Sequence, residues 1–287
     1  MRFMSQITFG VDFGLSVTDV VKASGGEVMA HAARHRPGPA TQDLLRRVLG
    51  DLEEGTLSGG DTRTAPIGVT GGRSRELPAR LGERRVLHVS ETDAVARGGL
   101  ALAGASRALV VSCGTGTAMV AADAGAQEFR HASGTAVGGG TLEGLSKHLL
   151  GMRDASTVAW LALQGDAAGV DTTLGEVLGG GVGHLPPAAT AVNLGRLAEL
   201  SNPEPADLAA GLVTLVGQTI ALVALNAAKV AGMQQTVFVG RLAEFEAVTQ
   251  VIRSVFDLYG VPHPLFPDGA GMATAFGAAL AVANSGR

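Results

Sequence analysis

The sequence places a short glycine turn between two strand-like stretches twice. The first copy, GVDFGLSVTD, covers residues 10–19, and the second, SCGTGTAMV, covers residues 112–120. Apolar runs ending at glycine predict that each copy is a β-hairpin closed by small residues. Further α/β segments follow each hairpin. We therefore expect two related α/β lobes, residues 1–96 and 97–287, with a cleft between them.

Regular elements are expected along the rest of the chain. Apolar residues at helical spacing predict a helix over 40–55, for which Thr41 is the expected N-cap. A strand is expected within 65–72, and the segment 85–104 passes from strand to helix. Later helices are expected over 138–151, 154–166, 204–232, 245–260 and 271–284. One further strand is expected over 235–242.

Composition narrows the class of protein. The chain has 42 glycines among 287 residues, which is typical of tight turns and close backbone approaches around small ligands. The net charge is −4 and the basic residues form no stripe, so nucleic acid is a poor candidate partner. The single cysteine, Cys113, excludes an intrachain disulfide and fits a reducing cytoplasm. The N-terminal stretch shows no apolar signal core, which also favours the cytoplasm.

One stretch is long enough to consider as a membrane span. Residues 211–228 carry no charge, and their number reaches the length that crosses a bilayer. They include Gln218, Thr219 and Asn226, however, and a strand-like TVFVG follows soon after. We therefore expect a buried central helix and no membrane partner.

The first turn carries a carboxylate. Asp12 lies between a strand and the glycine turn, where it could face a Mg²⁺–nucleotide while the backbone of Gly14 and Ser16 meets phosphate. The alternative is an ordinary hairpin with a capping aspartate.

The second turn has the same design without the acid. Gly114 and Gly116 let the backbone curl around an anion, and Thr115 and Thr117 add hydroxyl groups. An ordinary tight hairpin is again the alternative. Two such turns at equivalent places favour phosphate binding at both.

Two other glycine sites belong to the same expectation. Gly138, Gly139 and Gly140 directly precede a helix, whose unpaired N-terminal amides could bind phosphate or a nucleoside. A packing turn is an equal alternative. Gly240 ends a strand at a place where adenosine could stack.

Several titratable residues have two interpretations. Glu91 and Asp93 stand at a strand-to-helix junction, where either could be a general base or an N-cap. Cys113 has no evident base beside it and is expected to be a buried filler. The histidines show no metal-ligand spacing.

The order of these motifs resembles the type II pantothenate kinases of the actin/hexokinase/Hsp70 ATPase superfamily. The similar segments run from GVDFG through TGG, ETD and GTGT to GTAVGGGT and FVG, and so span nearly the whole chain. The most specific part is GTAVGGGTLEGLSKHLLG together with LALQGDAAGVD.

This resemblance implies a fold, a reaction and roles for residues. It implies a two-lobed actin-like ATPase (ribonuclease H-like) fold with an interlobe nucleotide cleft, and a homodimer built through the long helix. It further implies transfer of the ATP γ-phosphoryl group to pantothenate, with Mg²⁺ and coenzyme A or an acyl-CoA as a feedback ligand. Glu91 takes the place of the catalytic base and Asp12 that of the metal ligand. The acceptor contacts fall on Arg130, His131 and Thr135.

The chain departs from the pattern of these kinases at two positions. Asp19 stands where they carry a lysine, and His131 where they carry the arginine that grips the acceptor. Two alternatives therefore accompany the pantothenate prediction: a kinase for another small hydroxylated molecule, and a catalytically weak homologue that binds nucleotide or acyl-CoA as a sensor. Two other classes of protein in this superfamily are excluded because the chain lacks the cysteines that they need. Dehydratase activators need more thiolates than one cysteine supplies, and the repressor/sugar kinases resemble proteins with a cysteine-rich zinc motif that this sequence lacks.

Overall fold

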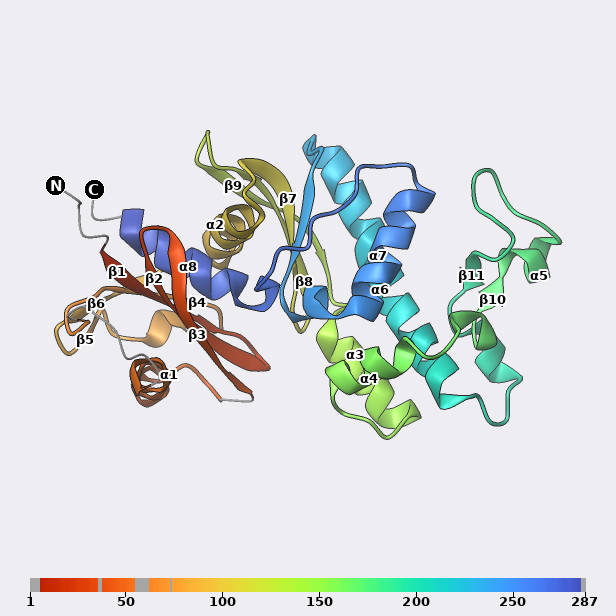
Figure 1. The fold of residues 1–287 in the computed structure, drawn as a ribbon, viewed down its shortest axis with the longest axis horizontal. Helices are drawn as coiled ribbons and strands as arrows, with labels where there is room; N and C mark the ends of the chain where they lie inside the picture. Colours follow the sequence, from red (N-terminus) through yellow and green to blue (C-terminus); the bar gives the residue numbers. More distant parts are fainter. Residues whose placement is uncertain (1–5, 36–37, 55–61, 73, 285–287) are drawn as a thin grey trace. The chain divides into compact units, whose positions relative to one another are not determined.

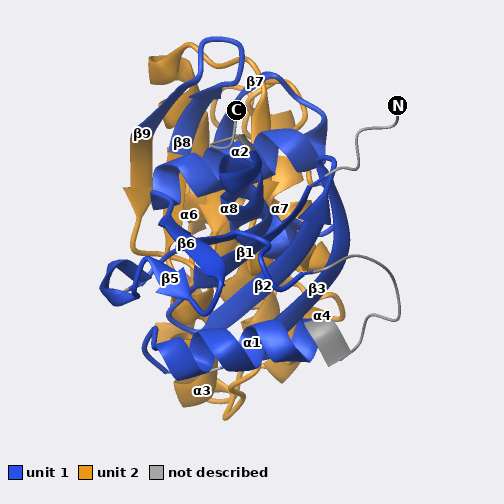
Figure 2. Ribbon diagram, turned by 90° about the vertical axis from the view of Figure 1, so that its left-hand side faces the viewer, with its two compact units in different colours: residues 1–110, 120–131, 267–287 blue, residues 111–119, 132–266 orange. Residues whose placement is uncertain are grey.

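The computed structural model describes residues 6–35, 38–54, 62–72 and 74–284. Its contacts divide the chain into two compact units. Unit 1 contains residues 1–110, 120–131 and 267–287, and unit 2 contains residues 111–119 and 132–266 (Figure 2). Both units are assembled from separate stretches of sequence. The expected lobe boundary between residues 96 and 97 concerns functional lobes and stays a prediction.

Unit 1 is built on a six-stranded sheet with the order β3-β2-β1-β4-β6-β5 (Figure 1). The hairpin strands β1 and β2 pair antiparallel, whereas β1, β4 and β6 pair in parallel. The strands are β1 (Ile7–Phe13), β2 (Val17–Ser24), β3 (Glu27–His35), β4 (Ile67–Thr70), β5 (Arg80–Leu81) and β6 (Arg84–His88).

Helices cover both faces of this sheet. Helix α1 (Gln42–Glu54) contributes Leu44, Leu45 and other apolar side chains to the core on one face. The expected cap is confirmed, because the Thr41 hydroxyl accepts a hydrogen bond from the Leu44 amide. Helix α8 (Ala273–Asn284) packs on the other face and against α2 (Glu91–Ala103). That contact is close enough for a Cβ on Gly98 to overlap the backbone of α8.

A second sheet has the order β12-β7-β8-β9. Its strands are β7 (Arg107–Cys113), β8 (Thr117–Asp123), β9 (Glu128–Thr135) and β12 (Thr236–Val239). The expected hairpins are therefore present as β1–β2 and β7–β8. In each case the next strand along the chain, β3 or β9, extends the hairpin to a three-stranded meander that the sequence analysis did not predict.

The remaining elements of unit 2 are mainly helical. The long helix α6 (Pro205–Ala231) packs against α4 (Ala155–Ala162) and α7 (Glu246–Leu258). By length and composition α6 could cross a membrane, but 61% of its most apolar stretch is buried, which supports the buried-helix interpretation. The elements are α3 (Gly139–Leu149), α4 (Ala155–Ala162), β10 (Thr172–Thr173), α5 (Leu174–Leu178), β11 (Thr190–Val192), α6 (Pro205–Ala231) and α7 (Glu246–Leu258), with short 3₁₀ turns at Ser74–Glu76, Ala167–Gly169, Gly195–Ala198, Arg241–Glu244 and Ala270–Met272.

Candidate functional site

Asp12 lies near the end of β1, between two strands that also carry polar side chains. In the antiparallel register it is directly opposite Asp19 of β2, and in the parallel register it is beside Thr70 of β4. Gly10, two residues earlier on β1, lies directly beneath α8. Because alternate residues of a strand share a face, Asp12 lies on the face that α8 covers. Asp19, Asp12 and Thr70 therefore lie side by side on that face, next to the first turn.

The environment of Asp12 disfavours its ionised form. Burial, then the charge of Asp19 and then that of Glu91 raise the pKa of Asp12 from 3.8 to about 7. All the charged neighbours that produce this shift are acids. The Asp12 carboxyl thus holds a proton more tightly than a typical aspartate.

Gly71 is required by the position of the Asp12 side chain. Its φ of +74° belongs to the left-handed region, and a Cβ at this position would overlap Asp12 Oδ1. The TGG stretch at the end of β4 therefore makes room for the carboxylate.

Asp19 is buried, with only 5% of its surface exposed. Its Oδ1 lies 2.9 Å from Nε2 of His31 on β3. The histidine is itself partly exposed, and its ring N–H can donate to the carboxylate. The acid that replaces the expected lysine is thus held in place by a second strand.

The two acids at the start of α2, Glu91 and Asp93, have different hydrogen-bond partners. Ser90 is the N-cap of α2: its hydroxyl accepts from the Asp93 amide and donates to Asp93 Oδ2, at 3.0 and 2.8 Å. Asp93 therefore takes part in the cap. Glu91 is exposed, and its carboxylate makes no hydrogen bond or ion pair with any residue that the structure describes. Glu91 takes no part in the cap, and its role as a base stays a prediction.

The second turn is supported by the start of α3. The amides of Gly139 and Gly140 donate to the carbonyl oxygens of Gly114 and Thr115, at 2.8 and 2.9 Å. This differs from the expectation that the N-terminal amides of the helix are unpaired. These two amides are used to hold the turn, as in the packing-turn alternative.

Close packing accounts for the glycines around the second turn. A Cβ on Gly138 would lie 2.6 Å from the Thr115 carbonyl oxygen, and one on Gly140 would lie 2.7 Å from Thr115 Cγ2. Gly240 has a φ of +87°, and its Cβ would lie 2.5 Å from the Cys113 carbonyl oxygen. The structure therefore brings the second turn, the triple glycine and Gly240 together within unit 2.

The threonines near the second turn have structural partners. The Thr117 hydroxyl donates to the Val137 carbonyl oxygen at 2.9 Å, and the Thr135 hydroxyl accepts from the Val137 amide at 3.1 Å. The proton of Thr117 is thus committed to the backbone. Phosphate contacts from Gly114–Thr117 and an acceptor contact from Thr135 stay predictions.

The two candidate acceptor residues on β9 point in opposite directions. The neighbouring Phe129 ring lies 4.9 Å from the guanidinium of Arg97 on α2. His131 shares the face of Phe129 because it is two residues further along the strand, whereas Arg130 lies on the other face. Both are exposed. Of the two, His131 is therefore on the side of the helix that begins with Glu91.

Cys113 is fully buried. Burial raises the pKa of its thiol from 9.0 to about 12, so the thiolate needed for nucleophilic chemistry does not form near neutral pH.

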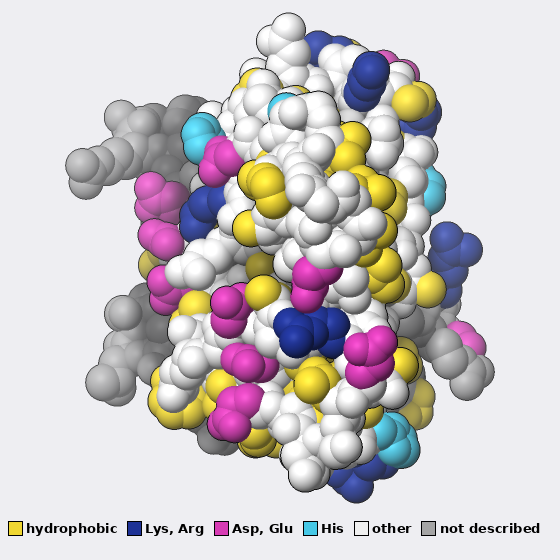
Figure 3. Space-filling view, turned by 90° about the vertical axis from the view of Figure 1, so that its right-hand side faces the viewer, with side chains coloured by type: hydrophobic (Ala, Val, Ile, Leu, Met, Phe, Trp, Pro, Cys, Tyr) yellow, Lys and Arg dark blue, Asp and Glu magenta, His cyan; other side chains and the backbone are white. Residues whose placement is uncertain are grey.

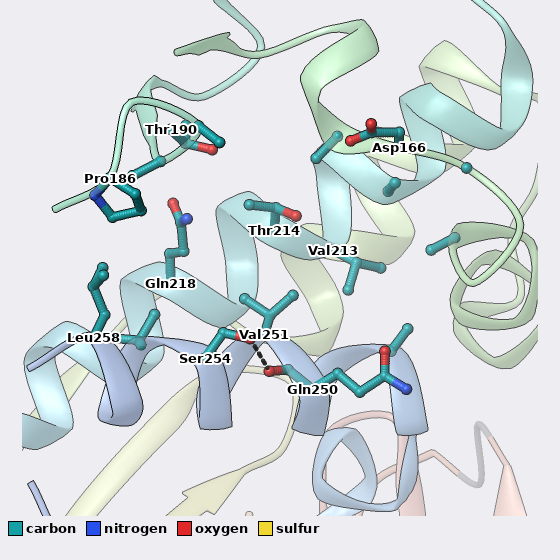
Figure 4. A pocket seen from close by; sticks show the side chains of 18 of the residues that line it. Asp166, Pro186, Thr190, Val213, Thr214, Gln218, Gln250, Val251, Ser254 and Leu258 are labelled. Carbon is teal, nitrogen blue, oxygen red and sulfur yellow. Dashed lines mark hydrogen bonds between the residues drawn. The ribbon is translucent and has the colours of Figure 1, made fainter. Parts of the chain in front are cut away.

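Unit 2 also contains a cavity of about 570 Å³ between α6, α7 and the segment around residues 185–190. Thr214 and Gln218 of α6 and Ser254 of α7 bring polar groups to it, and Pro186 and Thr190 lie across from them (Figure 4). Asp166 adds a carboxylate, although its Oδ1 already caps the next turn through the Ala168 amide. Such a lining fits a small molecule with both apolar and hydroxyl or amide groups.

Exposed apolar side chains are frequent in unit 2. Figure 3 shows one face of the molecule, where apolar side chains lie in patches between charged groups. The large apolar side chains exposed in this unit include Leu149, Trp160, Leu163, Val177, Leu178, Val182, Val192, Leu222, Val230 and Tyr259.

A profile of the Fumble family matches residues 107–281, which include the second turn, the triple glycine and Gly240. The chain belongs to the Fumble family. Among curated proteins it is similar to a type II pantothenate kinase of Bacillus cereus, with 28% identity over 78% of this chain and 83% of the relative. The type II pantothenate kinase of Oceanobacillus iheyensis is 30% identical over 61% of this chain and 66% of the relative.

Solved structures confirm the predicted fold class of this Fumble member. The activator of 2-hydroxyisocaproyl-CoA dehydratase from Clostridium difficile, with bound ADPNP, has a TM-score of 0.67 at 19% identity and covers 98% of this chain and 95% of its own. A glucokinase of the ROK family from Streptomyces griseus has a TM-score of 0.58 at 17% identity, with 96% and 98% covered. These neighbours share the actin-like ATPase fold and say nothing further of the chemistry.

Sequence reasoning missed three parts of this arrangement. It did not pair Asp19 with His31, because β3 was not predicted, and it gave no role to Thr70 or to the cavity. The signal for the first was the run GEVMAHAARH, in which His31 stands on a strand that pairs with β2. The cavity is lined from segments far apart in the sequence, so no local pattern pointed to it.

Proposed function

We propose that this chain is an ATP-dependent kinase that transfers the γ-phosphoryl group to the primary hydroxyl of pantothenate. The observation that carries the proposal is the different environment of the two acids at the start of α2. Asp93 serves the helix cap, while the exposed Glu91 stands one residue into the helix without a hydrogen bond among the described residues. The names of the curated relatives support pantothenate as the acceptor.

In this proposal each group has one task. Glu91 accepts the proton of the acceptor hydroxyl as the hydroxyl oxygen attacks the γ-phosphorus and the bond from this phosphorus to the bridging oxygen of ADP breaks. The backbone of Gly114–Thr117 binds phosphate oxygens. The carboxylate oxygens around Asp12 are hard donors that fit Mg²⁺, which would neutralise phosphate charge when bound. His131 is the better placed of the two β9 residues to contact the acceptor, because it faces the side of α2.

The proposal extends to assembly and location. The exposed apolar side chains of unit 2 support a homodimer, and the kinase relatives support a cytoplasmic enzyme. Coenzyme A or an acyl-CoA is proposed as a feedback ligand.

The test is an ATP-consumption assay with pantothenate on the wild type, Glu91→Gln and Asp93→Asn. Loss of the base should lower kcat by about 100-fold or more. The matched Asp93→Asn change removes a carboxylate two residues away and should leave kcat within about threefold, because it alters only the cap. Turnover that survives Glu91→Gln would contradict the assignment of the base.

A second candidate is a homologue that binds nucleotide or acyl-CoA without efficient turnover. It is favoured by the Asp12–Asp19 pair, since a second carboxylate beside the first turn repels phosphate. Retained ATP or acetyl-CoA binding with no turnover on pantothenate or other small primary alcohols would support this candidate and contradict the kinase.

A further inference from the structure

Helix α2 reaches the β8–β9 hairpin through one long side chain. The guanidinium carbon of Arg97 lies 4.9 Å from the centre of the Phe129 ring on β9. Its Nη2 also donates a hydrogen bond of 3.3 Å to Oε1 of Gln127, which directly precedes β9. All three residues belong to unit 1. Arg97 therefore links the helix that begins with Glu91 to the strand that carries His131.

The two ends of this link are held by separate contacts. On α2, Gly98 next to Arg97 lies so close to α8 that a Cβ on it would overlap the Ala273 carbonyl oxygen. In the hairpin, Gln127 has a φ of +51°, a left-handed conformation that is uncommon for residues other than glycine. Its Nε2 donates to the Ala124 carbonyl oxygen at 2.6 Å, which supports this conformation. Arg97 thus joins a closely packed helix to a hydrogen-bonded turn.

Strand β9 is an edge strand. In the order β12-β7-β8-β9 it pairs only with β8, and no described strand lies on its other side. An edge strand is paired along one side only, so contacts from outside the sheet matter more for its position. Phe129 and His131 share a face because they are two residues apart, a separation of about 7 Å along the strand. A contact that fixes the Phe129 ring therefore also restrains His131.

The Arg97 side chain leaves part of its hydrogen-bonding capacity unused. Its Nε is buried and has no hydrogen-bond partner among the residues that the structure describes. A buried donor without a partner costs free energy, and methionine would pack on the Phe129 ring without this cost. Stability alone therefore does not account for an arginine at this position. What the guanidinium adds is a directed contact with two residues of the hairpin at once.

We propose that Arg97 is a positioning residue for phosphoryl transfer, which holds His131 at a fixed place relative to Glu91. This role rests on the proposed function, in which Glu91 takes the proton of the acceptor hydroxyl and His131 contacts the acceptor. Glu91 lies six residues before Arg97 in the same helix, which is about 9 Å along its axis. The contact with Phe129 thus sets the separation of the base from the acceptor contact, and a shift of about 1 Å in such a separation can slow a reaction by about 100-fold.

The experiment measures KM and kcat for pantothenate in Arg97→Met and Phe129→Leu. Each change removes the cation–ring contact and keeps an apolar side chain, so KM should rise by about fivefold or more. The value of kcat should stay within about twofold, because the Ser90 cap and the α8 contact still hold Glu91. The double variant should have the KM of the single variants, since both changes break the same contact.

Two matched controls accompany these variants. Phe129→Tyr keeps an aromatic ring beneath the guanidinium and should retain the KM of the wild type. Arg107→Met removes an arginine whose Nε lies 3.4 Å from Oδ2 of Asp123, an ion pair between β7 and β8. That ion pair does not involve α2, so its loss should leave KM within about twofold. Thermal unfolding checks that every variant is folded at the assay temperature.

Hydrogen–deuterium exchange of the ligand-free chain tests the same contact without the reaction. Arg97→Met should speed the exchange of amides in 127–131 by about fivefold or more and leave those in 91–96 unchanged. Unchanged exchange at 127–131 would overturn the inference, as would an unchanged KM or a fall in kcat alone. No turnover of pantothenate by the wild type would refute the proposed function, and the exchange result would then decide alone whether Arg97 fixes β9.

Discussion

The two glycine turns share a backbone design but differ in the groups around them. The β1–β2 turn is flanked by Asp12 and Asp19, which face each other across the hairpin. The β7–β8 turn is flanked by no acid, and its carbonyl oxygens accept hydrogen bonds from the first amides of α3. The first turn therefore concentrates negative charge, whereas the second is a neutral loop of backbone groups.

The turns also differ in how exposed they are. Leu15, at the tip of the first turn, is 86% exposed. The second turn is enclosed by Gly138 and Gly140 on one side, and Gly240 presses on the end of β7. A repeated hairpin thus gives two kinds of site, because the neighbouring strands and helices decide its charge and exposure.

The largest expected effect comes from filling the space behind the second turn. Gly240→Ala should lower the free energy of unfolding by about 3 kcal/mol, because it combines a positive φ with a Cβ that overlaps the backbone of Cys113. Gly232→Ala is the matched control: its φ of +63° is also positive, but open space surrounds it. It should cost about 1 kcal/mol.

Urea unfolding of the two variants measures this difference. Equal losses for Gly240→Ala and Gly232→Ala would mean that the enclosure of the second turn contributes nothing beyond backbone strain. Close packing around the second turn would then not distinguish it from an exposed turn.

A smaller effect should appear at the first turn as a dependence on pH. The pKa of Asp12 is about 7 in the folded chain against 3.8 as the ordinary value. Between these values the folded state keeps a proton that the unfolded state has lost, so raising the pH through this window lowers the stability of the wild type. Asp12→Asn removes this loss and should be the more stable protein at pH 8, by about 2 kcal/mol, with a smaller advantage at pH 5.

Thermal and urea unfolding at the two pH values, with a chelator present, would measure the effect. All other titrating groups are common to both proteins, so the difference between them isolates Asp12. An advantage that is the same at pH 5 and pH 8 would show that burial and the neighbouring acids do not raise the pKa of Asp12.

The sequence predicted the elements of this fold well where local patterns decide them. Helix α1 begins after Thr41 as expected, and both hairpins are present. Strands β3 and β9 were missed because they lack a continuous apolar pattern: β3 alternates exposed and partly exposed residues, and its stability comes from pairing with β2. Such pairing depends on tertiary contact and is weakly encoded in any short window.

The candidate site was predicted in its parts but not in its contacts. The glycine motifs marked the second turn, the start of α3 and the end of β12, and packing brings them together. Which amides are used could not be read from spacing, since the partners of Gly139 and Gly140 are carbonyl groups of a distant loop. The choice between Glu91 and Asp93 likewise required the geometry of the Ser90 cap.

The smallest expected effect is an absence of reaction at Cys113, beside the second turn. Its thiol is buried and its pKa is raised to about 12, so iodoacetamide at pH 8 should leave the folded chain unmodified and label it fully in denaturant. Mass spectrometry of the intact chain distinguishes the two states. Because Gly240 closes over the backbone of this residue, Gly240→Ala should increase the labelling rate while Gly232→Ala should not. Rapid labelling of the wild type would show that the end of β7 opens readily and that the packing around the second turn does not protect it.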